Sequence, residues 1–185
     1  EQKATLLKTM EVFNQAANVA ATAGFDSRVF SQPSIHRLVY YPLRESTGLT
    51  AQLVVRAIGK AVECFKRDKK IRPTFKSRSS IVYDQRIMRF KELTHVSLAT
   101  IDGRLMLPLI VAGYQKERLQ AAIKTGQADL VYIQGTFYLL LSIELEPAPA
   151  RQAADVLGVD LGIAKIAVDS EGNAYTGEDV ERYRV

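Results

Sequence analysis

The spacing of apolar residues changes at Pro73, and this change constrains the fold class more than any other feature of the chain. Before Pro73, apolar side chains recur at helical spacing from Leu6 to Ala20 and again from Leu49 to Phe65, which predicts two amphipathic helices. A shorter helix is expected after Pro33, with its end near Pro42.

The expected helix ends follow from residue types that interrupt or cap helices. Gly24 is expected to end the first helix, because glycine is common just beyond the last helical turn. Ser46 or Thr47 is expected to cap the start of the last one. The charged segment 68–73, which finishes at a proline, is expected to end it.

Beyond Pro73, short apolar and β-branched runs between turn residues predict strands. The expected strands are 81–83, 86–90, 95–100, 104–111, 129–133 and 136–144. Asp102-Gly103 and the turn at Gly135 predict two hairpins, whereas 115–125 has helical character and Gly126 would end that helix. A helical half followed by an antiparallel half indicates an α+β fold, with a small barrel or curled sheet as the second part.

Composition divides the chain further. Two prolines in an alanine-rich stretch mark a linker at 147–154. We therefore expect a helical region at 1–74, a strand-rich region at 75–146, and a further unit at 155–185 that begins with a strand, a turn and a second strand.

Several protein classes are disfavoured by the sequence. No uncharged apolar run of 18 residues occurs, so a transmembrane helix is not expected. Cys64 cannot form an internal disulfide, and with His36 and His95 it cannot complete a four-ligand zinc site. A reducing, cytoplasmic setting is therefore expected. Because the chain begins at Glu1 without a secretory pattern, we interpret it as a trimmed or partial polypeptide.

Positive charge is concentrated between Arg56 and Lys91. These 36 residues hold twelve Lys/Arg and three acids, a net +9, whereas the whole chain is +5. Such a block attracts polyanions and makes binding sensitive to salt. The interspersed rings of Phe65, Phe75, Tyr83 and Phe90 could stack on bases or anchor the segment to the core. The candidate nucleic-acid-binding residues are Arg56, Lys60, Lys66, Arg67, Lys69, Lys70, Arg72, Lys76, Arg78 and Arg86.

Asp160 is the candidate catalytic and metal-binding residue. It follows an apolar strand and lies between Gly158 and Gly162, whose small size lets phosphate oxygens approach. A carboxylate so placed suits Mg²⁺, and two-metal phosphodiester hydrolysis uses two or three such acids. Sugar kinases of the actin-like fold open with the same pattern, but too little sequence follows Asp160 for a complete kinase. Asp169 is expected to form a hairpin turn instead.

Ordered motifs along the chain carry a family resemblance. They are Glu1-Gln2 with Leu6-Leu7, Phe75 to Arg86, Ser97 to Arg104, Gly126 to Val131, Gly135 to Leu139, Leu157 to Ile163 and Ala167 to Gly172. In this order they resemble one branch of the TnpB/OrfB family, transposon-encoded RNA-guided nucleases related to the type V CRISPR effectors.

The resemblance implies a specific architecture. Residues 1–74 would be a helical recognition region inserted in an oligonucleotide-binding-like β-barrel, the wedge domain, which 75–146 would form. Residues 155–185 would open a RuvC nuclease domain of ribonuclease H fold. Asp160 matches the first of three metal-binding acids, and the other two, with a zinc ribbon, would follow Val185.

The functional hypothesis is an RNA-guided, Mg²⁺-dependent DNA endonuclease whose partners are guide RNA and target DNA, in a prokaryotic cell and close to the nucleoid. This chain would bind without cutting, because its metal site is incomplete. One alternative is a non-cleaving, repressor-like nucleic-acid-binding protein of the same lineage. Another is a basic α+β domain that binds protein or no specific partner.

Overall fold

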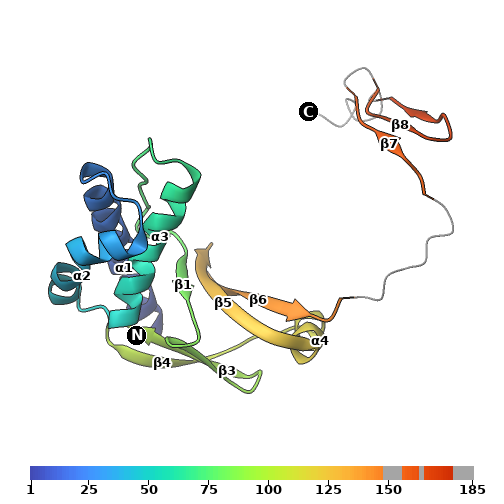
Figure 1. The fold of residues 1–185 in the computed structure, drawn as a ribbon. Helices are drawn as coiled ribbons and strands as arrows, with labels where there is room; N and C mark the ends of the chain where they lie inside the picture. Colours follow the sequence, from blue (N-terminus) through green and yellow to red (C-terminus); the bar gives the residue numbers. More distant parts are fainter. Residues whose placement is uncertain (148–155, 163–164, 177–185) are drawn as a thin grey trace. The chain divides into compact units, whose positions relative to one another are not determined.

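The computed structural model describes residues 1–147, 156–162 and 165–176. Its contacts group into two compact units, Glu1–Glu146 and Pro147–Val185. Within the described residues the fold is α+β, with four helices and three antiparallel sheets of three strands each (Figure 1). The predicted fold class is therefore confirmed at this level.

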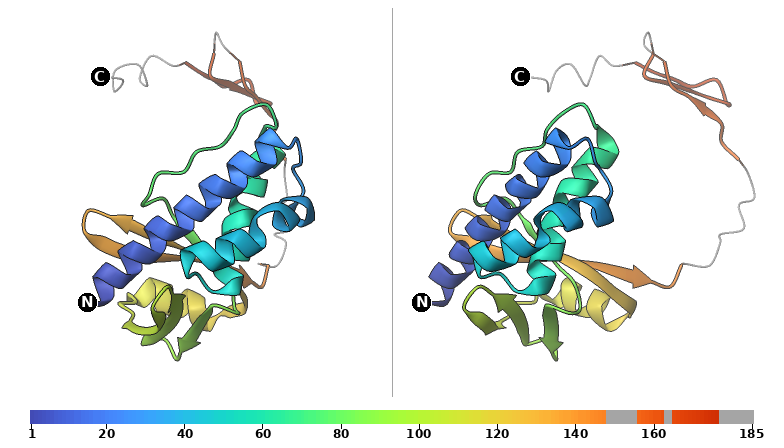
Figure 2. Two further views of the ribbon diagram at one scale, coloured as in Figure 1. Left: turned by 90° about the vertical axis from the view of Figure 1, so that its left-hand side faces the viewer. Right: turned by 60° about the vertical axis from the view of Figure 1, so that its left-hand side comes forward.

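Three helices pack together at the start of the first unit (Figure 2). They are α1 (Gln2–Asp26), α2 (Gln32–Thr47) and α3 (Ala51–Arg67). Small side chains are buried on both α1 and α3, which permits a close approach of the two helices. These buried alanines are Ala16, Ala17, Ala20, Ala21, Ala57 and Ala61.

Two of the predicted helix ends are wrong, because packing outweighs the local breaking tendency. Gly24 lies inside α1 and is buried, and a Cβ atom there would come within 2.7 Å of Ile35 Cδ1, so glycine serves the contact with α2. Pro42 lies inside α2, which continues to Thr47 because Val39 and Leu43 are buried on either side of the proline.

The start of α3 also differs from the prediction. Thr50, not Ser46 or Thr47, is the N-cap residue of α3. The hydroxyls of Ser46 and Thr47 instead donate to the carbonyls of Pro42 and Leu43, one turn earlier in α2. The end of α3 at Arg67 agrees with the expected stop at the following charged segment.

The strand-rich half of the first unit forms two separate sheets. One has the order β1 (Ile81–Tyr83), β5 (Ala122–Ile133), β6 (Thr136–Leu145). The other has the order β2 (Met88–Lys91), β3 (His95–Thr100), β4 (Gly103–Pro108). Within the described residues neither sheet closes into a barrel.

Both predicted hairpins are present, although the first turn is displaced by one residue. Thr100 pairs with Gly103, so the turn consists of Ile101 and Asp102. In the second hairpin, Gln134 and Gly135 both have positive φ, as the tight turn between two antiparallel strands requires.

The helix predicted at 115–125 is partly wrong. Helix α4 (Gly113–Gln120) ends before Ala122, where β5 begins. The β-branched Ile123 and Thr125 favour a strand, and Thr125 pairs with Ile143 of β6. Gly126 lies in an irregular stretch between Thr125 and Ala128 and therefore does not end a helix.

One apolar core joins the helices to both sheets. The Tyr83 side chain of β1 is fully buried, and its hydroxyl donates to the Ala99 carbonyl of β3 at 2.9 Å. This hydrogen bond links the two sheets, and burial raises the pKa of the Tyr83 hydroxyl well above its ordinary range.

The second unit contains a small antiparallel meander of order β7 (Val159–Asp160), β8 (Ala167–Asp169), β9 (Ala174–Tyr175). Its strands and the turn at Gly172, which has a φ of +89°, follow the predicted pattern. Of the predicted linker at 147–154, residues 148–154 lie outside the described residues, as does Asp155. No described helix has the length and apolar character that crossing a bilayer requires.

Candidate nucleic-acid interface

Lys60 is one of two predicted cations that the fold uses internally. It lies half-buried on α3, and its Nζ atom donates to Asn14 Oδ1 at 2.7 Å and to the Ser80 carbonyl at 2.6 Å. The Phe75 ring centroid is 4.7 Å from the same atom. Burial lowers the pKa of Lys60 to about 8. Lys60 therefore belongs to the internal scaffold.

Two asparagines on α1 hold the segment 75–80 beside the helices. Asn14 is fully buried, and its Nδ2 atom donates to the carbonyls of Ser77 at 3.1 Å and Ser79 at 2.8 Å. Asn18 exchanges two hydrogen bonds with the backbone of Phe75, at 2.9 and 2.7 Å. Sequence reasoning missed this clamp, although two amides four residues apart within an apolar helix pattern were a visible signal.

The clamp presents two of the predicted cations to solvent. Lys76 and Arg78 are both exposed on the held segment. Arg78 pairs with Glu11, with 3.3 Å between Nε and Oε1, but both side chains are about half exposed. Such surface pairs are weak, so a phosphate can compete for the guanidinium.

Arg56 is the second internal cation. Its Nε atom lies 3.0 Å from Asp84 Oδ2, which also accepts from Gln52 Nε2 at 2.6 Å. The backbone N–H of Arg86 donates to the other carboxylate oxygen at 2.9 Å. Burial alone would raise the pKa of Asp84, but these hydrogen bonds and the Arg56 charge outweigh it and lower the pKa below its ordinary value.

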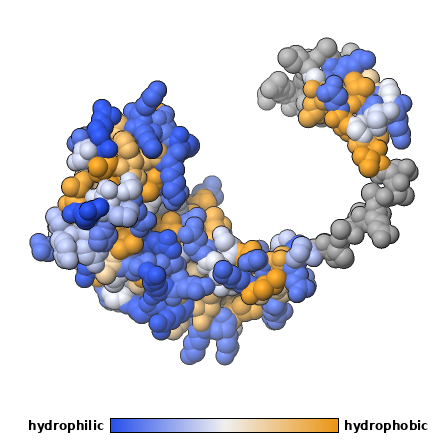
Figure 3. Space-filling model, viewed as in Figure 1, coloured by the Kyte–Doolittle hydropathy of each residue, from blue (hydrophilic) through white to orange (hydrophobic). Residues whose placement is uncertain are grey.

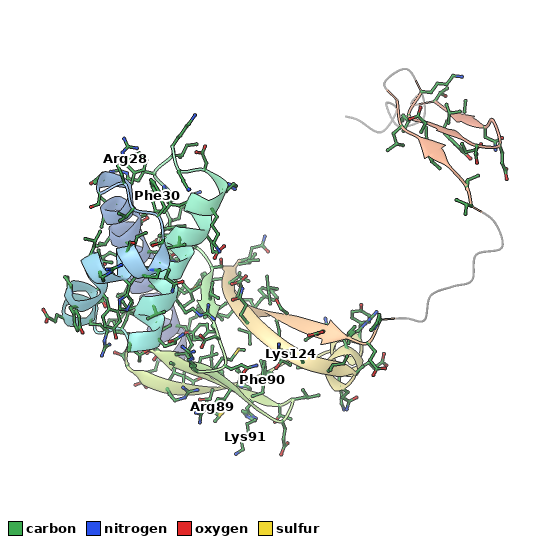
Figure 4. The ribbon with its side chains drawn as sticks, in the orientation of Figure 1. Arg28, Phe30, Arg89, Phe90, Lys91 and Lys124 are labelled. Carbon is green, nitrogen blue, oxygen red and sulfur yellow. The ribbon has the colours of Figure 1, made fainter. Side chains whose placement is uncertain are left out.

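A polar groove of about 510 Å³ opens beside this ion pair. Its walls come from the start of α2, from α3, from the turn between β1 and β2, and from the first half of β5. Lys124 and Arg86 are exposed on it, and Lys124 is labelled in Figure 4. Four glutamines also line the groove, namely Gln32, Gln52, Gln85 and Gln127. Gln52 is held by Asp84 and Arg86, and Gln85 donates to the Thr125 carbonyl. Amide side chains both donate and accept, so Gln32 and Gln127 suit base edges and sugar–phosphate groups.

Sequence reasoning identified Arg56 and Arg86 of this groove but missed the glutamines and Lys124. These residues come from segments that lie far apart in the chain, and they are gathered by the packing of α2 and α3 against each other and of α3 on β1, together with the antiparallel pairing of β1 with β5. No local pattern marks them.

The largest group of exposed cations lies at the end of α3 and in the loop that follows. Its members are Lys66, Arg67, Lys69, Lys70 and Arg72. Lys66 pairs with the exposed Glu63 at 2.7 Å, again a surface pair. Hydrophilic side chains cover much of the visible face of this unit (Figure 3).

The four interspersed aromatic residues differ in role. Phe65 and Tyr83 are fully buried, so these two anchor the segment to the core. Phe75 and Phe90 are only partly buried and pack at the edge of that core. Of the two interpretations left open by the sequence, anchoring therefore holds for Phe65 and Tyr83.

Asp160 lies on β7 of the second unit, where it pairs with Val168 and is exposed. Asp169 is different, because only 6% of it is exposed. Its carboxylate accepts from the side chain of Asn173, from the backbone of Asn173 and Glu171, and from the Tyr175 hydroxyl. The hydrogen bond from the Asn173 side chain lowers the pKa of Asp169. Burial acts in the opposite direction, but the other hydrogen-bond donors also lower the pKa. Asp169 thus shapes the turn, as predicted.

The described residues do not by themselves fit a magnesium site. Among them, no three His, Cys, Asp or Glu side chains gather closely enough to hold a metal ion. Asp160 is exposed and would supply one oxygen ligand, whereas the Asp169 carboxylate is occupied by four hydrogen bonds.

No protein-family model matches the chain, and no curated protein gives a significant match to it.

Proposed function

We propose that the chain is the nucleic-acid-binding front part of an RNA-guided DNA endonuclease of the TnpB kind. The observation that carries the proposal is the exposure of the cations. Of the ten predicted nucleic-acid-binding residues, eight are exposed. The other two, Arg56 and Lys60, make internal contacts. A surface that keeps so many cations in solvent is suited to phosphate backbones.

The first unit would supply two kinds of contact. The cations beyond α3 would neutralise phosphates, which gives affinity without sequence preference. The glutamine-lined groove would add directional hydrogen bonds to bases or sugars. Guide RNA and target DNA are the proposed partners, and in RNA-guided systems the protein holds the paired strands by shape and charge.

The wedge-like role of residues 75–146 is part of the same proposal. Two antiparallel sheets that share a core and are linked by the Tyr83–Ala99 hydrogen bond are compatible with a curled, barrel-like unit. Residues 1–74 would then be the recognition region, and their helices pack on the core that these sheets share.

The second unit would open a RuvC-like nuclease domain. An exposed aspartate on the first strand of an antiparallel meander supports this assignment. When bound, Mg²⁺ would activate water and stabilise the leaving oxygen of a phosphodiester. Asp160 would hold one ligand position, and the remaining acids would come from sequence beyond Val185.

The binding half of the proposal is tested by titrating the chain into labelled RNA at several salt concentrations. Log Kd should rise with log salt by roughly 0.7–0.9 for each phosphate contacted, and several contacts should give a steep dependence. Binding that is absent, or unchanged between low and high salt, would contradict the proposal and favour the domain without a nucleic-acid partner.

A further inference from the structure

A hollow of about 410 Å³ lies where the connection between α1 and α2 meets the last turn of α3. The connection contributes Val29, Phe30 and Ser31, and the first turn of α2 contributes Ser34. Helix α3 and the residues after it contribute Phe65, Lys66 and Lys69. Pockets that hold small ligands have volumes of roughly 300–1,000 Å³, so a single nucleotide is of suitable size.

One wall of the hollow is a fixed aromatic ring. The Phe30 and Phe65 centroids are 5.0 Å apart, with an interplanar angle of 62°, which is an edge-to-face contact. Phe65 is fully buried, whereas Phe30, which is labelled in Figure 4, is only partly buried. Phe30 thus offers a ring held in place by the core, and every nucleobase has a flat face that can stack on such a ring.

The rim of the hollow is cationic. Lys69 Nζ lies over the Phe30 ring, 5.9 Å from its centroid, and this exposed lysine would have to move aside for a base to stack on that face. Lys66 is exposed on the same rim. The only acidic partner of Lys66 in the described structure is Glu63, in an exposed pair that a phosphate can replace. The hydroxyls of Ser31 and Ser34 bond to each other at 2.7 Å and keep spare capacity to donate and accept.

The combination selects the ligand class. A free phosphate would use the lysines but not the ring, and an apolar ligand would use the ring but not the lysines. A planar ring joined to a phosphate uses both. Because stacking on Phe30 requires a base that is not stacked within a duplex, the ligand is an unpaired nucleotide.

We propose that this hollow binds one unpaired nucleotide, with its base against Phe30 and its phosphate beside Lys66 and Lys69. The inference rests on the proposed function for the source of that nucleotide, which is a single-stranded part of a bound nucleic acid. A free nucleotide shares the same chemistry, so the experiment must separate the two sources.

The test compares two RNA probes, a blunt duplex and the same duplex with a five-nucleotide overhang. Wild type should bind the overhang probe more tightly. Phe30→Leu, which keeps apolar volume but removes the ring, should weaken overhang binding by roughly tenfold and change blunt-duplex binding less than twofold. Tyr41→Leu is the matched control, because Tyr41 is an aromatic residue of α2 that is 73% exposed and outside the hollow. It should leave both affinities unchanged.

Lys69→Gln provides a second variant that leaves the packed rings intact, and it too should weaken the overhang probe more than the blunt one. Circular dichroism establishes that each variant is folded. Equal weakening of both probes by these variants, or no weakening, would overturn the inference while leaving the proposed function in place.

A third arm titrates adenosine 5′-monophosphate and follows its binding by calorimetry. If wild type binds neither RNA, the proposed function fails, and nucleotide binding that is lost in Phe30→Leu would then identify free nucleotide as the source. If neither RNA nor the nucleotide binds, the inference and the proposed function are both wrong.

Discussion

The Nζ atom of Lys60 lies 2.7 Å from Oδ1 of the fully buried Asn14. Through this contact a cation of α3 completes a network that begins on α1 and holds the segment leading into β1. The exposed Lys76 and Arg78 are therefore positioned by the buried Asn14 and the half-buried Lys60.

Because Lys60 is part of this network, we predict that the free energy of unfolding increases as the pH rises above neutrality. The folded-state pKa of Lys60 is about 8, below its ordinary value of 10.5, so between these values the unfolded chain binds more protons. The contribution of Lys60 to the free energy of unfolding is constant below pH 8 and increases as pH rises from 8 to 10.5. Burial raises the pKa of Tyr83, which costs stability above pH 10, so measurements should stop below that pH.

Urea unfolding of wild type and Lys60→Met at pH 7, 8.5 and 9.5 measures this effect. The wild-type stability should increase relative to that of the variant across the series. A stability difference between wild type and Lys60→Met that stays constant from pH 7 to 9.5 would show that the pKa of Lys60 is not lowered in the folded state.

Asn14→Ala should destabilise the first unit by about 3 kcal/mol, because it removes donors from two backbone carbonyls and a partner from Lys60. Gln15→Ala, at the exposed neighbouring position, should change the free energy of unfolding by less than about 0.5 kcal/mol. Equal effects of the two substitutions in thermal or urea unfolding would argue against the clamp.

The carboxylate of Asp84 should make the free energy of unfolding depend on pH in the acid range. Its folded pKa is lowered, so its stabilising contribution is present above the unfolded pKa and is lost as pH falls through the folded pKa. Asp84→Asn should be less stable than wild type by about 2 kcal/mol at pH 7, and the gap should shrink between pH 5 and 3. Asp26→Asn, at an exposed position, serves as the control and should show no comparable gap.

The cations after α3 should contribute to binding more than those of α4. Lys69→Gln with Lys70→Gln should reduce the slope of log Kd against log salt by roughly 1.5 for single-stranded RNA. The matched pair Lys116→Gln with Arg118→Gln removes two exposed cations of α4 and should leave the slope close to that of wild type. Identical slopes of log Kd against log salt for the two double variants would mean that RNA binding depends only on the net charge of the protein and not on where the cations lie.

Much of the secondary structure could be predicted from the sequence. The apolar positions at helical spacing on α3 are all buried, namely Leu53, Val54, Ala57, Ile58, Ala61 and Phe65. The predictions were wrong at Gly24 and Pro42, where a breaking residue lies inside a helix because tertiary contacts hold both sides. Propensity is local, and these contacts are not.

The candidate interface was less predictable, for two physical reasons. A lysine in a basic run looks the same whether it faces solvent or, as Lys60 does, an asparagine of another helix. The groove residues Gln52 and Lys124 are 72 positions apart in the chain, and they meet because α3 packs against β1 and β1 pairs with β5. The turn-forming role of Asp169 could be predicted, because the residues after it have turn character. The role of Asp160 as a metal ligand stays a prediction.

In the proposed function, Asp160 serves metal-dependent cutting of DNA directed by RNA. The decisive measurement uses a polypeptide that carries this chain together with the downstream acids, loaded with guide RNA, and follows cleavage of target DNA with and without Mg²⁺. Wild type and the control Glu171→Gln, an exposed acid of the same unit, should cut only with the metal. Asp160→Ala should bind RNA with unchanged affinity and should not cut. Cleavage retained by Asp160→Ala would contradict the account, and no cleavage by wild type despite tight RNA binding would favour the non-cleaving, repressor-like alternative.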